Sequence, residues 1–267
     1  MSPFDLTTKE VIKKYNLQAQ KSFGQNFIIN QSLTDKIVGH FEGIEDQTII
    51  EVGPGPGGLT RAIIAKDLKK LYLIELDNKF ESLFADLQVA YGERLGVKFA
   101  DILKVKFSEF GNDIGIISNL PYNISTPFLI KCCFEAENIN QMLLMFQREV
   151  AERIIASPGS KVFGRLSVMA QSFFEIKKVV NVGPSAFHPP PKVNSAVLHF
   201  KRKITLPDNI RVKQLEKIAA ELFCKRRKKI STILKHYDCS GVSVDLNKRP
   251  EQLQLKDFHE LAKLVKL

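Results

Sequence analysis

Two short stretches of this chain combine residue types and spacings that could do chemistry. The first, residues 48–60, is a β-branched apolar run that contains Glu51 and continues into a turn rich in glycine and proline. A strand that leads through such a turn into a helix brings bare backbone N–H groups close to a ligand, because glycine lacks a Cβ. Gly53, Gly55 and Gly58 have the spacing of a dinucleotide-binding turn, whereas an acid followed by glycines at alternate positions fits S-adenosylmethionine (SAM). This stretch alone leaves three interpretations open: NAD, SAM, or a glycine turn without a ligand.

The second stretch is Asn119-Leu-Pro-Tyr122, which could serve a transfer to an exocyclic amine. The lone pair of such an amine, for example N6 of adenine, is delocalised into the ring, so the nitrogen is a poor nucleophile. The side-chain carbonyl of Asn119 and the backbone carbonyl of Leu120 could accept its N–H groups, favour a pyramidal nitrogen and fix the direction of attack. Tyr122 offers a planar surface on which an extruded base could stack. The alternative is a strand-end turn that uses Asn and Pro only for its geometry.

The elements expected around both stretches alternate between strand and helix. Strands are predicted at residues 48–52, 71–75, 97–101, 114–119 and 141–146, with helices after the glycine turn, around 80–87 and at 126–134. This alternation predicts an α/β fold with a parallel sheet and helices on both faces. Polar residues lie at the ends of the first four strands, and the carboxyl ends of strands are where open α/β sheets bind ligands. We therefore expect a ligand site along this edge of the sheet.

The flanking segments are less regular. Near the N-terminus, Thr7 and Glu10 predict a capping box, residues 21–30 are expected to form a loop, and Ser32 is expected to cap the next helix. After residue 147 the pattern gives helices at 148–156 and 166–174, then strands at 177–182 and 193–200 around a loop stiffened by three successive prolines. Helices at 210–223, 227–236 and 250–265 follow. We therefore predict one domain over residues 1–204 and a small, all-helical domain over residues 205–267.

Charge is distributed unevenly along the chain. The formal net charge is +10, yet residues 1–150 hold 16 Lys/Arg against 19 Asp/Glu, and residues 151–267 hold 23 against 10. The basic surface is thus concentrated in the C-terminal half, which predicts a polyanionic partner. Candidate phosphate contacts are the run Lys225, Arg226, Arg227, Lys228 and Lys229, together with Arg202, Lys203, Lys248 and Arg249. A solvated charged face and a nuclear localisation signal are the alternatives for the run.

Other features of the composition restrict the class of protein. No apolar run reaches the ~18 residues that a membrane span requires, and no basic flank with an apolar region indicates a signal peptide. The four cysteines, at positions 132, 133, 224 and 239, lack CxxC spacing, which predicts reduced thiols and no zinc site. We expect a cytoplasmic protein without a bound metal.

Five motifs occur together and in order, and they make the chain resemble the rRNA adenine dimethyltransferase family, in particular its KsgA type, which acts on small-subunit (16S) rRNA. They are Lys21-Ser-Phe-Gly-Gln-Asn-Phe-Ile28, Glu51-Val-Gly-Pro-Gly-Pro-Gly-Gly-Leu-Thr60, Asn119-Leu-Pro-Tyr-Asn-Ile-Ser125, Gln147-Arg-Glu-Val-Ala-x-Arg153 and Phe187-x-Pro-x-Pro-x-Val-x-Ser195. The resemblance covers essentially the whole chain. It implies a Rossmann-like SAM-dependent methyltransferase fold, with a mostly parallel seven-stranded sheet in a catalytic domain and an rRNA-docking helical domain at the C-terminus.

The resemblance also implies roles for individual residues. SAM would be contacted by Asn26, Ile28, Gly53, Glu75, Asp101 and Asn119, with Glu75 on the ribose hydroxyls and Asp101 on the adenine amine. Asn119 and Leu120 would accept the target amine, and Phe187 would enclose the target base against Tyr122. Neither a metal nor a covalent intermediate is implied. The one departure is Ile28, where the family more often has Leu.

The implied activity is the dimethylation of N6 on two adjacent adenosines in the 3′-terminal hairpin loop of 16S rRNA, by a monomer that acts on the assembling small subunit during ribosome biogenesis. In bacteria, loss of this activity in the family is associated with kasugamycin resistance. A macrolide-resistance methylase acting on large-subunit rRNA is a rival within the class. A non-catalytic binding protein, like the related mitochondrial transcription factors, is a rival outside it. An NAD dehydrogenase would need a catalytic His or a Tyr/Lys pair, which no motif offers.

Overall fold

The computed structural model describes residues 3–20, 24–205 and 209–266, which form two compact units. The first unit comprises Met1–Phe128, Glu137–Ala151 and Lys177–Lys201, and the second comprises Leu129–Ala136, Glu152–Ile176 and Arg202–Leu267. The predicted boundary at residues 204 and 205 lies close to the start of the last segment of the second unit. A single boundary cannot represent the two earlier segments of that unit, because the chain enters it three times.

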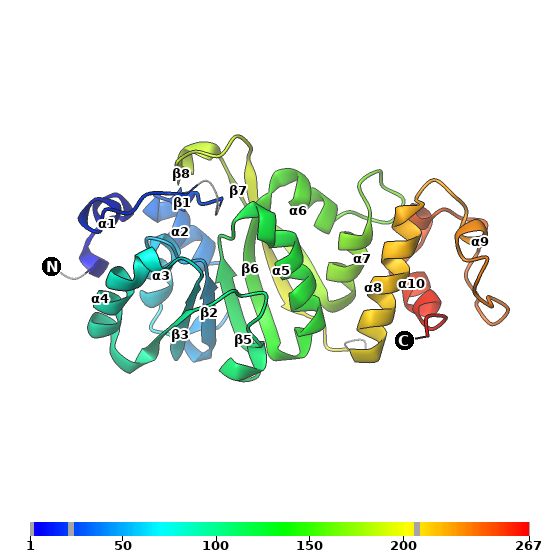
Figure 1. Cartoon of the computed structure of the whole chain (residues 1–267), viewed down its shortest axis with the longest axis horizontal. Helices are drawn as coiled ribbons and strands as arrows, with labels where there is room; N and C mark the ends of the chain where they lie inside the picture. Colours follow the sequence, from blue (N-terminus) through cyan, green and yellow to red (C-terminus); the bar gives the residue numbers. More distant parts are fainter. Residues whose placement is uncertain (1–2, 21–23, 206–208, 267) are drawn as a thin grey trace. The chain divides into compact units, whose positions relative to one another are not determined.

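A seven-stranded sheet is built mainly from the first unit, in the order β4-β3-β2-β5-β6-β9-β7 (Figure 1). Its strands are β2 (Thr48–Val52), β3 (Lys70–Glu75), β4 (Leu95–Phe99), β5 (Ile114–Ser118), β6 (Ile139–Gln147), β7 (Phe174–Val182) and β9 (Ser195–Arg202). Neighbouring strands from β4 to β6 are parallel, and β9 runs antiparallel to β6. The predicted α/β fold with a mostly parallel sheet is confirmed.

The apolar runs form strands because the central strands are covered on both faces. Ile49 and Ile50 of β2, Leu71 and Leu73 of β3, and Ile116 of β5 are all fully buried. Near-continuous apolar sequence is typical of parallel strands that pack helices on both sides. The third predicted strand is displaced: β4 ends at Phe99, so Asp101 lies two residues beyond it.

The order of the strands places the two chemical stretches side by side. The chain runs outward from β2 to β3 and β4, then returns to the other side of β2 to form β5. Ligands in such sheets bind at this reversal, outside the carboxyl ends of the strands. Here these ends are fastened together, because the Ser118 hydroxyl at the end of β5 donates to the Val52 carbonyl at the end of β2 (2.6 Å). The glycine turn and the Asn119 motif therefore leave the sheet as neighbours.

The helices of the first half are α1 (Thr8–Lys14), α2 (Gln31–Val38), α3 (Gly58–Ile64), α4 (Glu81–Tyr91), α5 (Tyr122–Phe134) and α6 (Arg148–Ile154). The capping box at Thr7 is confirmed, with Glu10 N–H donating to the Thr7 hydroxyl oxygen and Thr7 N–H to the Glu10 carboxylate. The cap predicted at Ser32 is wrong. Asn30 caps α2 by accepting the Leu33 N–H (3.0 Å), and Ser32 lies inside the helix and donates to the Asn30 side chain.

Two short strands occur in segments that periodicity assigns to loops. β1 (Phe27–Ile28) pairs with β8 (Phe187–His188) in a separate two-stranded sheet, with Ile28 opposite Phe187. The loop predicted over residues 21–30 thus contains a strand, while Lys21, Ser22 and Phe23 lie outside the described residues. The proline-rich loop likewise contains β8. Two residues per strand are too few for any periodic signal.

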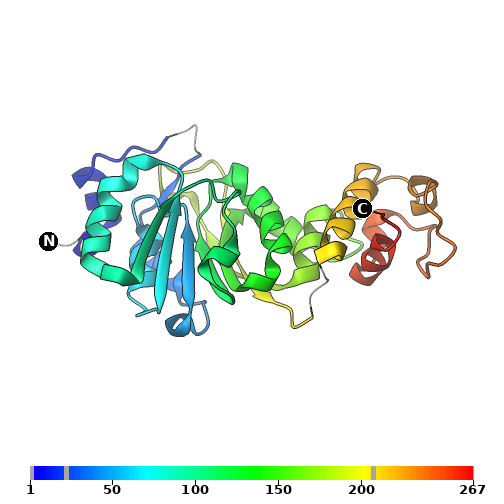
Figure 2. The same cartoon turned by 60° about the horizontal axis from the view of Figure 1, so that its bottom comes forward.

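The second unit is helical and contains α7 (Arg165–Phe173), α8 (Asn209–Cys224), α9 (Ile230–Ile233) and α10 (Leu255–Ala262). α8 lies beside α7 and α10 in both views (Figures 1 and 2), and the rings of Phe163, Phe223 and Phe258 pack together in its core. The long helix predicted at 227–236 is wrong: only one turn forms, after the run of like charges. The helix predicted at 250–265 is interrupted at Leu253, which is extended and fully buried.

Candidate active site

A pocket in the first unit opens at the carboxyl ends of the parallel strands. Its lining residues come from five segments, within residues 24–28, 51–59, 74–76, 100–103 and 119–124. The predicted site residues that line it are Asn26, Ile28, Gly53, Glu75, Asp101, Asn119, Leu120 and Tyr122. Residues separated by up to about 100 positions in the sequence are thus brought into one cavity.

The glycine turn forms one wall of this pocket. Gly53, Gly55 and Gly57 have φ angles of 64°, 53° and 80°, a region that strongly favours glycine. Gly58 has a different reason, since a Cβ there would lie 2.7 Å from the carbonyl oxygen of Ile28 in β1. The alternate glycines are needed for backbone conformation, and the fourth is needed for the close approach of β1.

Glu75, the last residue of β3, is held in place by hydrogen bonds from backbone N–H groups. Its carboxylate accepts from Leu76 (2.8 Å), Asp77 (3.0 Å) and Gly55 (3.3 Å). Burial raises the pKa of Glu75 above its usual value, and these hydrogen bonds offset only part of the effect. A fixed, buried carboxylate at the rim of the glycine turn is well placed to accept two hydroxyl groups.

Glu51, in β2, is the second buried acid of the pocket. Its side chain is almost fully buried, which raises its pKa to about 8, and the opposing effect of Thr60 is smaller. Its Oε2 atom makes no hydrogen bond within the described part of the chain. A buried, unpaired carboxyl oxygen in a pocket fits a cationic ligand, because such a ligand would supply the missing partner. SAM carries both a sulfonium and an ammonium group, so the residues present fit SAM.

Asp101 lines the pocket from the segment that follows the end of β4. One carboxylate oxygen, Oδ1, accepts the Leu103 N–H at 3.0 Å, which fixes the side chain on its own turn. Asp101 is half-buried and lines the pocket. This arrangement leaves the second oxygen as an acceptor for an amine in the cavity.

The orientation of the Asn119 side chain follows from one hydrogen bond. Its Nδ2 group donates to the backbone carbonyl of Asn26 at 3.1 Å. A carbonyl can only accept, so the amide nitrogen must face Asn26 and the side-chain carbonyl Oδ1 must point elsewhere. The acceptor that an amine substrate requires is thus fixed by a residue 93 positions earlier in the chain.

Tyr122, the first residue of α5, lines the same pocket and is half-buried. Its hydroxyl is 2.7 Å from the Ser195 hydroxyl at the start of β9, which leaves the ring as the group presented to a ligand. Burial raises the pKa of Tyr122, and the bond to Ser195 opposes this shift. Ser195 is the last residue of the proline-rich motif, so the motif contained a signal for this contact that the sequence argument did not use.

Phe187 is not among the lining residues. Its side chain is 3% exposed and packs in the hydrophobic core of the first unit, on β8 beside β1. The structure therefore brings Tyr122 to the pocket and places Phe187 on β8, which pairs with the pocket-lining strand β1. Enclosure of a base between the two rings remains a prediction.

The predicted phosphate contacts of the second unit fall into two groups. Lys225, Arg227, Lys228 and Lys229 are exposed, whereas Arg226 is half-buried and bonds the Ser160 carbonyl and Glu251. Backbone hydrogen bonds from Ile230 to Lys248 and from Ser231 to Leu246 bring Lys248 and Arg249 to this run. Lys203 instead lines a second pocket with Arg211, Lys256 and Lys263, which sequence reasoning missed because they are far apart in the chain. Arg202 has interacting partners of its own.

Comparison with known proteins identifies relatives of the whole chain. Residues 16–266 match the family model described as "Ribosomal RNA adenine dimethylase". "Ribosomal RNA small subunit methyltransferase A" of Rhodospirillum rubrum is 36% identical over an alignment of 263 positions that covers 96% of this chain and 91% of the relative. The crystal structure of a dimethyladenosine transferase from Plasmodium falciparum superposes with a TM-score of 0.74 at 26% identity, covering 88% of this chain and 95% of that one. The 23S rRNA methyltransferase ErmE shares the fold, with a TM-score of 0.68 at 23% identity over 89% of this chain and 98% of its own.

Proposed function

The chain belongs to the ribosomal RNA adenine dimethylase family, and we propose that its pocket holds SAM beside one flipped-out adenine of small-subunit rRNA. It is an enzyme that dimethylates adenine in 16S rRNA with SAM as the methyl donor. We propose that the targets are two adjacent adenosines of the 3′-terminal hairpin loop, each methylated twice.

The fixed orientation of the Asn119 side chain is the observation that carries this proposal. SAM supplies an electrophilic methyl group, and its transfer forms an N–C bond, breaks an S–C bond and leaves a neutral thioether. The chain's part is to hold the target nitrogen. Asn119 Oδ1, fixed by the bond from Nδ2 to Asn26, would accept one N–H of the amine, and the carbonyl of Leu120 would accept the other. Both acceptors favour the developing positive charge on nitrogen, and the amine proton then leaves to solvent.

The cofactor would be held by the other walls of the pocket. Glu75 would accept the ribose hydroxyls, Asp101 the adenine amine, and Gly53 would allow the methionine part to approach the backbone. Asn26 and Ile28 would cover the ligand from the N-terminal segment. Tyr122 would stack on the target base, with Phe187 as the predicted second ring.

The second unit would dock on rRNA phosphates through exposed cations, namely Lys225, Arg227, Lys228, Lys229 and the nearby Arg249. Contacts of this kind contribute affinity that falls with salt and carry no base identity. We further propose that the enzyme acts as a monomer on the assembling small subunit, and that it works in the cytoplasm. Among the described residues, no helix is long and apolar enough to cross a membrane.

Methyl transfer from labelled SAM tests the proposal. Unmethylated small subunits and large-subunit rRNA are offered in parallel, and the modified nucleosides are identified and mapped. Dimethyladenosine in the 3′ hairpin of 16S rRNA is the expected product. Label found only in large-subunit rRNA would contradict this function and indicate a resistance methylase instead. RNA binding without transfer of labelled methyl groups would indicate a non-catalytic RNA-binding protein.

A further inference from the structure

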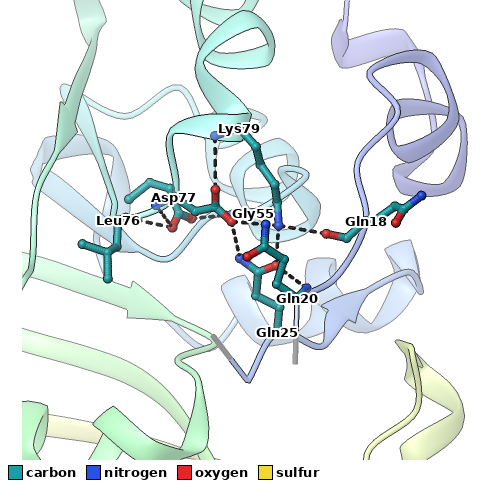
Figure 3. Close-up of polar contacts among 8 residues, drawn as sticks. Gln18, Gln20, Gln25, Gly55, Leu76, Asp77 and Lys79 are labelled. Carbon is teal, nitrogen blue, oxygen red and sulfur yellow. Dashed lines mark hydrogen bonds and ion pairs between the residues drawn. The ribbon is translucent and has the colours of Figure 1, made fainter. Parts of the chain in front are cut away.

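We propose that Lys79 is a positioning residue for methyl transfer: it ties the N-terminal segment that lines the cofactor pocket (described residues 18–20 and 24–28) to the turn after β3, and thereby fixes the carbonyl that orients Asn119. This inference rests on the proposed function of the pocket. It is carried by a cluster of polar contacts that joins the N-terminal segment to the β3 turn (Figure 3).

The ammonium group of Lys79 is fully used within the cluster. Nζ donates to the backbone carbonyl of Gln18 at 2.8 Å and to Gln25 Oε1 at 2.6 Å, and it forms an ion pair with Asp77 Oδ2 at 2.8 Å. An ammonium has three N–H donors, and these are three partners. Two of the partners belong to the N-terminal segment and one to the β3 turn, so a single side chain connects both.

Asp77 and Gln25 complete the connection. Gln25 Nε2 donates to Asp77 Oδ2 at 3.1 Å, and Gln25 Oε1 also accepts the Gln20 N–H at 3.0 Å. The side chains of Lys79 and Asp77 are only 20% and 9% exposed, so water screens the pair less than it screens a surface pair. Burial would raise the pKa of Asp77, but the hydrogen bonds from Lys79 and Gln25 lower it on balance.

The cluster borders the predicted ribose site on one side. The Asp77 N–H donates to Glu75 Oε1 at 3.0 Å, so the same turn holds both carboxylates. The Lys79 ammonium lies 4.9 Å from the ring centroid of Phe80 and 5.9 Å from that of Phe27. Phe27 in turn packs on the glycine turn, where a Cβ on Gly55 would lie 3.3 Å from its ring.

On the other side, the cluster reaches the target-base site through one peptide unit. Asn26 follows Gln25 directly, and its carbonyl accepts the Asn119 Nδ2 group. Gln25 and Asn26 both line the pocket. Release of Gln25 would therefore loosen this wall of the pocket and displace the Asn26 carbonyl that holds the Asn119 acceptor in place. Lys79 touches neither ligand, so its effect on both would be indirect.

Three variants and one matched control test the proposal. Lys79→Met keeps an unbranched apolar side chain and removes the charge, whereas Lys79→Arg keeps the charge. Gln25→Met removes the amide that bonds both Lys79 and Asp77. Lys98→Met is the control, because it breaks an exposed ion pair with Glu109 in the same unit. The measurements are the Kd for SAM by calorimetry, and kcat and KM for SAM and for small subunits. Amide hydrogen exchange over residues 18–20 and 24–28 reports the segment itself.

For Lys79→Met and Gln25→Met we expect the Kd and KM for SAM to rise about tenfold and kcat to fall about tenfold, as for loss of a charge-assisted bond. The KM for small subunits stays unchanged, exchange over residues 18–20 and 24–28 accelerates, and Lys79→Arg recovers most of the loss. Lys98→Met behaves as the wild type.

A Kd for SAM and a kcat within about twofold of the Lys98→Met values would overturn the proposal. A lower melting temperature, with KM and kcat per active site unchanged, would also overturn it, because that is the signature of a purely structural role. If Lys79→Met does not fold, the same measurements on Gln25→Met test the proposal. If the wild type transfers no methyl group, the proposed function fails, yet SAM affinity and exchange still test the fastening.

Discussion

Replacement of Glu51 by Gln should stabilise the SAM-free protein at alkaline pH. Burial raises the pKa of this carboxyl from 4.5 to about 8, and its Oε2 has no partner within the described residues. Between these two pH values the folded state keeps a proton that the unfolded state has released. The unfolding free energy therefore falls as pH rises, by roughly 1.4 kcal/mol per unit and on the order of 5 kcal/mol in total.

The Glu51→Gln variant lacks this titration, because an amide stays neutral in both states. We expect the two proteins to have similar stability near pH 5, and the variant to become progressively more stable than the wild type up to pH 8. SAM should reduce the difference at pH 8, since a bound cation favours the ionised carboxyl.

Urea unfolding at pH 5, 6.5 and 8, with and without SAM, measures the difference. Glu109→Gln serves as the control: its carboxyl is exposed and the bond from Lys98 lowers its pKa, so its loss gives no gain at pH 8. A wild-type-minus-variant difference that is the same at pH 5 and pH 8 would refute the reasoning about Glu51.

Three further predictions concern the pocket and the RNA surface. Gly58→Ala should lower the free energy of unfolding, measured in urea, by about 1–3 kcal/mol and weaken SAM binding, because its Cβ would clash with the Ile28 carbonyl. Gly241→Ala is the control and should change neither quantity, because a Cβ there would meet nothing within 4 Å. Tyr122→Phe should keep kcat within about threefold, whereas Tyr122→Leu should lose about a hundredfold, because stacking needs the ring and not the hydroxyl. Equal losses in the two tyrosine variants would contradict the stacking role. Neutralising Lys228 and Lys229 should lower the slope of log K against log salt for small-subunit binding by about 1–2; an unchanged slope would exclude them as phosphate contacts.

The sheet could be predicted because its signal is local. Runs such as residues 48–52 and 114–118 are mostly apolar, with Ile or Val at three positions in each, and parallel strands covered on both faces favour that pattern. The gathering of Glu75, Asp101 and Asn119 also followed, since the carboxyl ends of parallel strands meet at one edge. The pairing of the first and fourth predicted strands, β2 and β5, could not be predicted, because it depends on the order of strands in the sheet and hydrophobic periodicity does not reveal that order.

The remaining contacts lie between residues that no local pattern connects. Asn119 meets Asn26, Tyr122 meets Ser195, and Lys79 meets Gln25, across sequence separations of 93, 73 and 54 residues. The helix predicted at 227–236 failed for a related reason. The first backbone N–H groups of α9, at Ile230 and Ser231, are bonded to carbonyls of Lys248 and Leu246. The five successive cations before α9 disfavour a longer helix.

The most direct test of the central claim is methyl transfer by the wild type and by Asn119→Ala on unmethylated small subunits. We expect dimethyladenosine in the 3′ hairpin of 16S rRNA with the wild type, and a kcat lower by about a hundredfold or more in the variant. Undiminished dimethylation by Asn119→Ala would contradict the claim that this amide holds the target nitrogen.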